Sequence, residues 1–174
     1  MLFDLHVHSD ISPCSRLPLS QILAHARARG LDGVCVTDHD TLGHGLAIEE
    51  GLQPDGLCLI FGMEYATSEG DFLLFGPFAD LAPGLGAEPL LDLVRQRGGA
   101  AVGAHPFRAG RPLSERIVRQ GLCRAVEGLN GRNSVQENAL AANWRERFGV
   151  ALCGGSDAHS LEELGRSATR FDGP

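Results

Sequence analysis

Two short motifs near opposite ends of the chain constrain its fold more than any other feature. His6-x-His8 follows the apolar run 1–5, and Asp157-x-His159 follows the apolar run 150–153. Side chains two residues apart on a strand point to the same side, so each pair can present two donors to one ion. Imidazole and carboxylate donors are suited to Zn, Mn or Fe and differ from a structural cysteine-zinc knot. We therefore expect a fold that brings both ends of the chain to one metal site.

Ligand-type side chains also follow three of the intervening apolar runs. Together with the two pairs, they give seven candidate metal ligands: His6, His8, His39, Glu64, His105, Asp157 and His159. This number exceeds what one catalytic ion needs, because such an ion keeps an open position for water. We therefore expect two or three divalent ions, of Zn, Mn or Fe. His25, in a helix-like stretch, and His44, between two glycines, are expected to be ordinary polar residues.

The length and composition are typical of a globular protein. A chain of 174 residues can bury one core, so we expect residues 1–174 to form a single domain. Hydrophobic residues make up 43% and charged residues 21%, which are ordinary values. No apolar run approaches the length of a bilayer span, and no basic stretch precedes the first strand-like segment. We expect no membrane partner, neither anchor nor signal peptide, and a cytoplasmic location.

The five cysteines are odd in number and include no Cys-x-x-Cys pair, so neither a disulfide framework nor a zinc knuckle is expected. Cys35, Cys58 and Cys153 fall within apolar runs, where a free thiol behaves as a small hydrophobic group. Cys14 is different because it lies in the loop just past His8, close to the expected ions. It is the one cysteine that we expect to have a role.

The net charge of −7 bears on the partners that the chain can bind. Duplex nucleic acid normally requires a broad basic face, so this charge predicts no duplex partner. Two or three divalent ions would reverse the sign locally. The expected partner is therefore a small phosphorylated anion, or the end of a strand, held in one pocket. The sequence indicates nothing about the oligomeric state.

Apolar runs alternate with helical periodicity along the whole chain. The predicted strands are residues 2–8, 33–37, 57–62, 72–76 as an antiparallel return, 100–104, 125–129 and 150–153. The predicted helices are residues 19–29, closed by Gly30, 90–97, 114–121, capped by Ser114, and 134–148. Such alternation predicts crossovers in an open sheet or a barrel. Because ligands from the first, last and most middle strands must meet, we expect a small, irregular β/α barrel with its site at the carboxyl ends of the strands.

These residues resemble the polymerase-and-histidinol-phosphatase (PHP) family over essentially the whole chain. The matching motifs are Asp4-Leu5-His6-Val7-His8-Ser9, Thr37-Asp38-His39-Asp40, Gly62-Met63-Glu64, Ala104-His105-Pro106 and Gly155-Ser156-Asp157-Ala158-His159. The resemblance implies a distorted seven-stranded β/α barrel and a metal-dependent phosphoesterase with two or three ions, with Glu64 as a bridging ligand. The chain departs from the family pattern at three positions where relatives often place a further ligand: Pro13-Cys14, the Asp71 hairpin and Asn130.

The expected reaction is hydrolysis of a phosphate ester by a metal-activated water. Arg108, Arg111 and Arg132, close behind His105 and Asn130, can hold phosphate oxygens, although solvated loop charges are an equal alternative. Asp38 is expected either to orient a histidine or to coordinate directly. The substrate could be a nucleotide, a sugar phosphate or an oligonucleotide end. Two other functions stay open: hydrolysis of a carbon–nitrogen bond, and a non-catalytic binding module braced by its metal.

Overall fold

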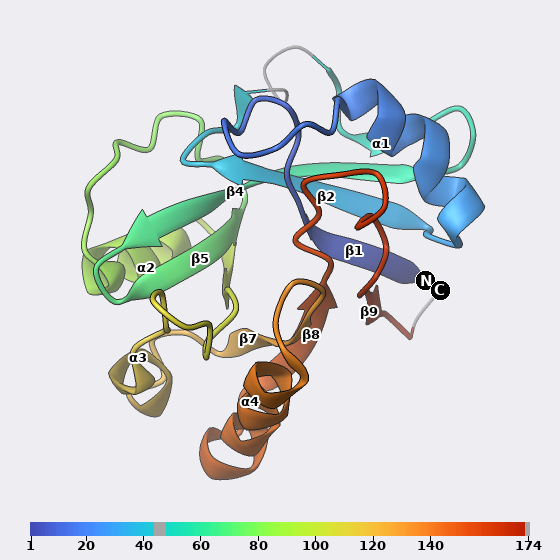
Figure 1. Cartoon of the computed structure of the whole chain (residues 1–174). Helices are drawn as coiled ribbons and strands as arrows, with labels where there is room; N and C mark the ends of the chain where they lie inside the picture. The colour runs from blue at the N-terminus through green and yellow to red at the C-terminus, as the bar shows by residue number, and fades with distance from the viewer. Residues whose placement is uncertain (44–47, 173–174) are drawn as a thin grey trace.

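The computed structural model describes residues 1–43 and 48–172, whose strands form one nine-stranded sheet. The sheet curves into a nearly closed barrel (Figure 1). The strands are β1 (Leu2–Val7), β2 (Gly33–His39), β3 (Gly51–Leu52), β4 (Cys58–Thr67), β5 (Gly70–Phe75), β6 (Ala100–Gly103), β7 (Ala125–Asn130), β8 (Ala151–Gly155) and β9 (Thr169–Arg170). Their order is β8-β7-β6-β5-β4-β2-β1-β9, with β3 paired to β4. The pairs are parallel except around β5, β3 and β9, which run antiparallel to their neighbours.

The barrel closes where the two ends of the chain meet. Val7 and Ala158 form a parallel bridge between β1 and the segment that follows β8. The backbone N–H of Asp157 donates to the carbonyl of His6 at 2.7 Å, and the N–H of His8 donates to the carbonyl of Ala158 at 2.9 Å. The residues that close the barrel are therefore the two paired motifs themselves.

The predicted barrel is confirmed, but the expected number of seven strands is wrong. The seven expected strands correspond to β1, β2 and β4 to β8. The other two, β3 and β9, have two residues each and exist only because they pair with β4 and β1. Because β1 pairs with β9 from the other end of the chain, we propose that residues 1–174 form a single domain.

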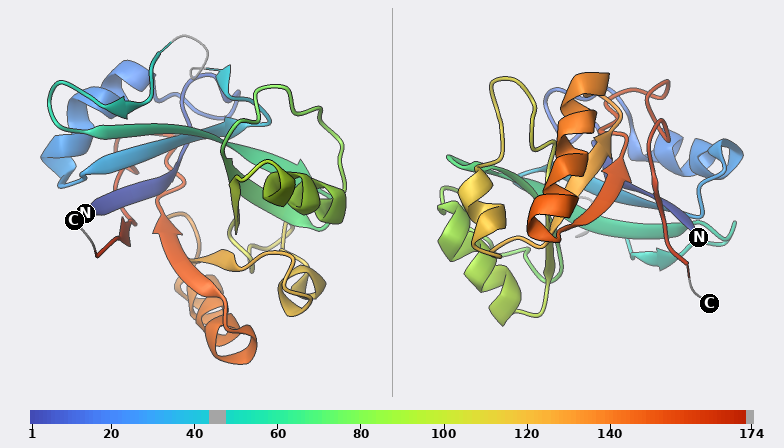
Figure 2. Two further views of the ribbon diagram at one scale, coloured as in Figure 1. Left: turned by 180° about the vertical axis from the view of Figure 1, so that it is seen from behind. Right: turned by 90° about the horizontal axis from the view of Figure 1, so that it is seen from below.

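Helices cover the outer face of the sheet (Figures 1 and 2). They are α1 (Leu19–Ala26), continued by a 3-10 turn at Arg27–Arg29, α2 (Ala87–Gln96), α3 (Glu115–Arg119) and α4 (Val135–Phe148). Gly30 ends the first helix with a φ of 79°, a conformation that glycine adopts without steric cost. Ser134 and Glu137 form a capping box at α4, whereas Ser114 occupies the cap of α3 without the predicted side-chain hydrogen bond. None of the helices in the described part of the chain is long and apolar enough to span a bilayer.

Two apolar clusters hold the helices to the sheet. Leu19 and Ile22 of α1 are buried in a cluster with residues of β1, β2 and β4, such as Val34. Leu90 of α2 and Trp144 of α4 are buried in a second cluster that covers β4, β5 and β7. Burying one such aliphatic side chain stabilises the fold by roughly 1.5–3 kcal/mol. This packing fixes the strands from outside and leaves the carboxyl ends of the parallel strands free to carry polar side chains.

Candidate metal centre

The seven candidate ligands meet at one end of the barrel. His6 lies in β1, His39 is the last residue of β2, and Glu64 lies in β4. The other four follow the ends of strands: His8 follows β1, His105 follows β6, and Asp157 and His159 follow β8. All but His39 and His159 are almost completely buried. Polar side chains at these positions are costly to bury unless they are paired or bind an ion, so their convergence indicates a functional site.

The first ligand group consists of His6, His8 and Asp157. The Nε2 atoms of the two histidines lie 2.9 Å apart. The Asp157 Oδ1 atom lies 3.4 Å from Nε2 of His8 and 3.6 Å from Nε2 of His6. Two nitrogens and one carboxylate oxygen therefore lie close enough together to hold one ion, and this donor set suits a divalent metal.

Glu64 connects this group to its neighbours. Its Oε1 atom lies 2.8 Å from Nε2 of His105, and its Oε2 atom lies 3.0 Å from Nδ1 of His39 and 3.3 Å from Nε2 of His8. His39 is placed there by strand register, because β2 and β4 pair with His39 directly opposite Glu64. One carboxylate therefore contacts ligand-type side chains that lie in β2 or follow β1 and β6.

Two further ligand groups lie beside the first, and Glu64 is a member of one of them. One is Glu64, Asp71 and His105, and the other is His8, His39 and His159. Within the described residues, Oδ2 of Asp71 and Nδ1 of His105 are buried side-chain atoms without a hydrogen-bond partner. Buried polar atoms nearly always have a partner, so unsatisfied ones beside a ligand group indicate a missing cation or ordered water. The donor chemistry and these unsatisfied atoms together fit bound divalent ions.

Two of the ligands have strained backbones. His105 and Asp157 have positive φ angles, of 28° and 55°. Such conformations cost on the order of 1–3 kcal/mol and persist only where surrounding contacts enforce them. The N–H of His105 donates to the carboxylate of Glu127 at 2.7 Å, and the N–H of Asp157 is held by His6. Placing these two side chains at the site therefore lowers the stability of the fold.

Burial and neighbouring charges shift the pKa values of several side chains in the cluster. Burial alone would lower the pKa of His6, but the carboxylates of Asp157, Glu127 and Glu64 hold this pKa well above its ordinary value. Burial would raise the pKa of Glu64, but the charge of His6 and hydrogen bonds from histidines hold it well below its usual range. Burial and the charge of His8 lower the pKa of His159 to about 4. The Glu64 carboxylate is therefore ionised, as a metal ligand must be.

Three buried residues that support the ligands were not among the candidate site residues: Glu127, Asp4 and Ser12. Glu127 accepts from His6 Nδ1 at 2.9 Å, and Asp4 accepts from the backbone N–H of Ser156 at 2.8 Å. Burial raises the pKa of Asp4 to about 6, although the hydrogen bonds that Asp4 accepts from Ser156, Gly165 and His6 oppose that shift. A signal existed for both acids, since each interrupts an apolar strand, but a strand pattern does not reveal what a side chain contacts.

The Asp38 carboxylate is linked to the candidate ligand His8 through the hydroxyl group of Ser12. Its carboxylate accepts from the backbone N–H of Ser9 and from the hydroxyl groups of Ser9 and Ser12. The Ser12 hydroxyl group in turn lies 3.3 Å from Nδ1 of His8. This chain of contacts favours the expectation that Asp38 orients a histidine. No candidate ligand group within the described residues includes Asp38.

Three arginines line the same cavity as the ligands. The cavity has a volume of about 200 Å³ and is lined by Cys14, His39, Glu64, His105, Arg108, Arg111, Arg132, Asp157 and His159. Each arginine is already anchored: Arg108 to Asp157 at 2.7 Å, Arg111 to Asp71 at 2.9 Å, and Arg132 to Nδ1 of His159 at 2.9 Å. These anchors place positive charge at the opening of an otherwise acidic site.

Other residues singled out in the sequence lie as follows. Cys14 lines the cavity, with its Sγ atom 3.2 Å from Nε2 of His159, and Asn130 donates to Glu127 and accepts from Arg108. Cys35 is buried, and Cys58 and Cys153 are half-buried against the same apolar cluster. His25 is exposed on α1, as expected of an ordinary polar residue. His44 lies outside the described residues.

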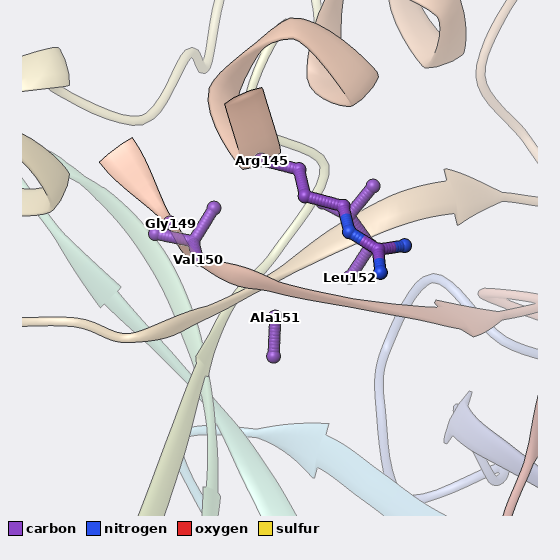
Figure 3. A pocket seen from close by; sticks show the side chains of 5 residues that line it. All are labelled: Arg145, Gly149, Val150, Ala151 and Leu152. Carbon is purple, nitrogen blue, oxygen red and sulfur yellow. The ribbon is translucent and has the colours of Figure 1, made fainter. Parts of the chain in front are cut away.

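A second pocket lies at the opposite end of β8 (Figure 3). It has a volume of about 470 Å³ and is lined by Arg145, Gly149, Val150, Ala151 and Leu152. Although it is larger than the cavity at the ligands, it contains one charged side chain and no ligand-type residue. Its chemistry is that of a surface hollow, so the candidate site is the smaller cavity.

Solved structures share this fold. A protein of Bifidobacterium adolescentis, described as a candidate metal-dependent phosphoesterase, has a TM-score of 0.77 and 18% identity, over 98% of this chain and 93% of that chain. Endonuclease Q, in complex with a 27-mer duplex substrate carrying an abasic lesion at its active site, has a TM-score of 0.68 and 17% identity, over 92% of this chain and 50% of that chain.

The Endonuclease Q complex overturns one expectation from the sequence. We expected no duplex nucleic acid because the net charge is −7, but a protein with this fold binds duplex DNA at its active site. The exclusion is therefore wrong. Its physical error was to average charge over the whole surface, whereas binding depends on local charge, and here Arg108, Arg111 and Arg132 gather at the cavity.

Sequence comparisons place the chain among known proteins. It is 28% identical to the uncharacterized protein MJ1587 of Methanocaldococcus jannaschii over 154 residues, which cover 82% of this chain and 88% of that protein. The model of the PHP domain matches residues 4–140, and the model of the PHP-associated region matches residues 135–174. The first match covers most of the chain and includes five of the seven candidate ligands. The chain therefore belongs to the PHP domain family.

Proposed function

We propose that the chain is a metal-dependent hydrolase that acts on phosphate esters. One observation carries this proposal: three arginines line the same cavity of about 200 Å³ as five of the seven candidate metal ligands. Arginine presents planar N–H groups that match the oxygens of a phosphoryl group. A site for neutral amide substrates has no comparable need for three positive charges at its opening.

The ligand groups would hold two or three ions of Zn, Mn or Fe. The proposed ligands are His6, His8, His39, Glu64, Asp71, His105, Asp157 and His159. When bound, such ions supply Lewis-acid polarisation of the phosphoryl group and activation of water. Glu64 would hold more than one ion, because its two oxygens contact members of each group.

The arginines are proposed to bind and orient the phosphoryl oxygens. Arg108 uses Nε and Nη2 to contact Asn133, Asn130 and Asp157, and within the described residues its Nη1 atom makes no such contact. Arg111 gives one nitrogen, Nη2, to Asp71. Each guanidinium is therefore held in place while some of its donors stay available. Asp38 orients His8 through Ser12 in this proposal.

The size of the cavity limits which part of a substrate enters it. Pockets that enclose a whole drug-sized ligand have volumes of about 300–1,000 Å³, and this cavity is smaller. It fits a phosphoryl group and its nearest atoms, while the rest of the substrate lies outside. This favours a phosphate carried on a nucleotide, a sugar phosphate or an oligonucleotide.

The test is hydrolysis by protein reconstituted separately with Mn, Zn and Fe. The three substrates are p-nitrophenyl phosphate, bis-p-nitrophenyl phosphate and an N-acyl amino acid. We expect release of p-nitrophenol from at least one phosphate ester, lost on chelation and restored by the metal. Hydrolysis of the N-acyl amino acid alone, or binding of metal without turnover of any of the three, would overturn the proposal.

A further inference from the structure

Glu127 is a buried carboxylate in the middle of β7, with a side chain that is 0% exposed. It has three contacts within the described residues: Nδ1 of His6 at 2.9 Å, the backbone N–H of His105 at 2.7 Å and Nδ2 of Asn130 at 2.8 Å. None of these partners is an arginine. Burying a carboxylate costs stability even when it is paired, so its use here calls for an explanation other than fold stability.

One oxygen of Glu127 controls the imidazole of His6. Oε1 can only accept a hydrogen bond, so Nδ1 of His6 must carry a proton. Nε2 of His6 is the atom that faces His8 and Asp157. With a proton fixed on Nδ1, a neutral His6 presents the lone pair of Nε2 to the first ligand group.

The other oxygen controls the backbone of His105. Oε2 accepts from the N–H of this residue, whose φ angle of 28° is unfavourable. The same oxygen accepts from Asn130, whose side-chain oxygen accepts from Arg108 at 2.8 Å. One carboxylate thus connects a ligand from β1, a ligand that follows β6 and an arginine of the cavity.

The chain also leaves room for this contact. A Cβ atom at Gly155 would lie 2.5 Å from Cβ of His6 and 2.9 Å from Oε1 of Glu127. Only glycine at this position lets β8 pass beside the pair. The contact between His6 and Glu127 is therefore built into the packing of three strands.

We infer that Glu127 is a positioning residue, which fixes His6 with its proton on Nδ1 and holds the backbone of His105 so that both can bind ions. This inference rests on the proposed metal site and adds to it a residue that touches no ion. Glutamine cannot replace Glu127. In one orientation its NH₂ group would face Nδ1 of His6, which would move the ring proton to Nε2. In the other orientation the NH₂ group would face the N–H of His105, so that two hydrogen-bond donors would point at each other.

The experiment compares Co²⁺ binding, followed by visible absorption, in the parental protein, in Glu127→Gln and in a matched control, Glu146→Gln. Glu146 is an exposed residue of α4, so the control removes the same charge far from the site. We expect Glu127→Gln to bind Co²⁺ about 10- to 100-fold more weakly, with an altered spectrum, and the control to match the parental protein. Parental affinity and spectrum in Glu127→Gln would overturn the inference alone. A parental protein that binds no Co²⁺ would overturn the proposed function as well.

A second measurement does not depend on the variant folding. Two-bond ¹H–¹⁵N correlations of the histidine rings in the Zn²⁺-loaded parental protein report which nitrogen carries each proton, and nuclear Overhauser contacts to assigned backbone amides identify the His6 ring. We expect His6 to be protonated on Nδ1. A His6 ring protonated on Nε2 would overturn the inference.

Discussion

The two ends of β8 carry pockets of opposite chemistry. The pocket before the strand has a volume of about 470 Å³ and is bordered by Gly149, Val150 and Arg145 (Figure 3). The cavity after the strand has a volume of about 200 Å³ and contains Asp157 and His159. The larger hollow is lined by no ligand-type side chain, and the smaller one is lined by five of the seven candidate ligands. Size alone therefore does not identify a functional site in this fold.

Features that lower the stability of the fold also distinguish the two ends of β8. Asp157 combines a buried charge with a φ angle of 55°. Val150, at the other end, is buried among apolar side chains of the main core. Strain and buried charge lower stability, so their concentration at the carboxyl end of the strand indicates a region shaped for function, while the amino end is shaped for packing. Carboxyl ends of barrel strands are where loops from several strands can meet.

The comparison predicts its largest effect for Asp157→Asn. This change removes the negative charge from the first ligand group and from the pair with Arg108. Loss of a residue that only orients a ligand costs about 10- to 100-fold, so we expect hydrolysis of a phosphate ester to fall by more than about 100-fold. Arg145→Gln, at the other end of β8, is the matched control and should stay within about twofold. Equal effects of the two variants would contradict the comparison.

Proton release is the second prediction. In the metal-free protein, nearby carboxylates raise the pKa of His6, and the hydrogen bond that His39 donates to Glu64 raises the pKa of His39, so at neutral pH protons offset the negative charge. Binding needs neutral imidazoles, so ions must displace these protons. Affinity should therefore rise with pH until the pH passes the raised pKa of His6, by up to about tenfold per unit for each proton released. Calorimetry at pH 7 in buffers with different ionisation enthalpies measures the release, and a buffer-independent heat would refute it.

Gly155→Ala tests the packing at the carboxyl end. The added Cβ atom would lie 2.5 Å from Cβ of His6, and overpacking of this kind typically costs about 1–3 kcal/mol. We expect a lower free energy of unfolding in urea together with weaker binding of Co²⁺. Gly86→Ser, at the cap of α2 where a Cβ atom meets only Pro89 at 3.8 Å, should leave both within about 1 kcal/mol. Normal metal binding in Gly155→Ala would show that His6 tolerates displacement.

Arg132→Gln should have the smallest effect. Arg132 is partly exposed and contacts His159, so its loss should hardly change stability. A hydrogen bond to a charged group is worth about 1.5–3 kcal/mol, so KM for a phosphorylated substrate should rise about 10-fold or more. Steady-state kinetics beside a melting curve measures both quantities. An unchanged KM would assign Arg132 to the solvent-exposed surface rather than to the substrate.

The sequence predicts the parts of this site that lie at the ends of strands. The His6 and Asp157 motifs follow apolar runs, and the requirement that they share ions predicts a barrel. Parallel strands place their carboxyl ends together, so the residue types and their spacing were enough. The two-residue strands β3 and β9 carry no such signal, because they are defined only by their partners.

The supporting residues could not be predicted in the same way. Glu127 and Asp4 stand inside apolar strands, and alternation predicts the side of the strand but not the atom that each carboxylate meets. The contact between Glu127 and His6 joins residues 121 positions apart. It depends on how β1, β7 and β8 cross, which packing decides in three dimensions. The strain at His105 likewise becomes visible only when its backbone is placed.

The most direct measurement is anomalous X-ray diffraction from crystals of protein loaded with Mn²⁺. The account predicts at least two anomalous peaks, at bonding distance from donor atoms of His6, Glu64 and His159 and their neighbours. Peaks confined to the outer surface, or no peak beside Glu64, would contradict the claim that these strands form one metal centre.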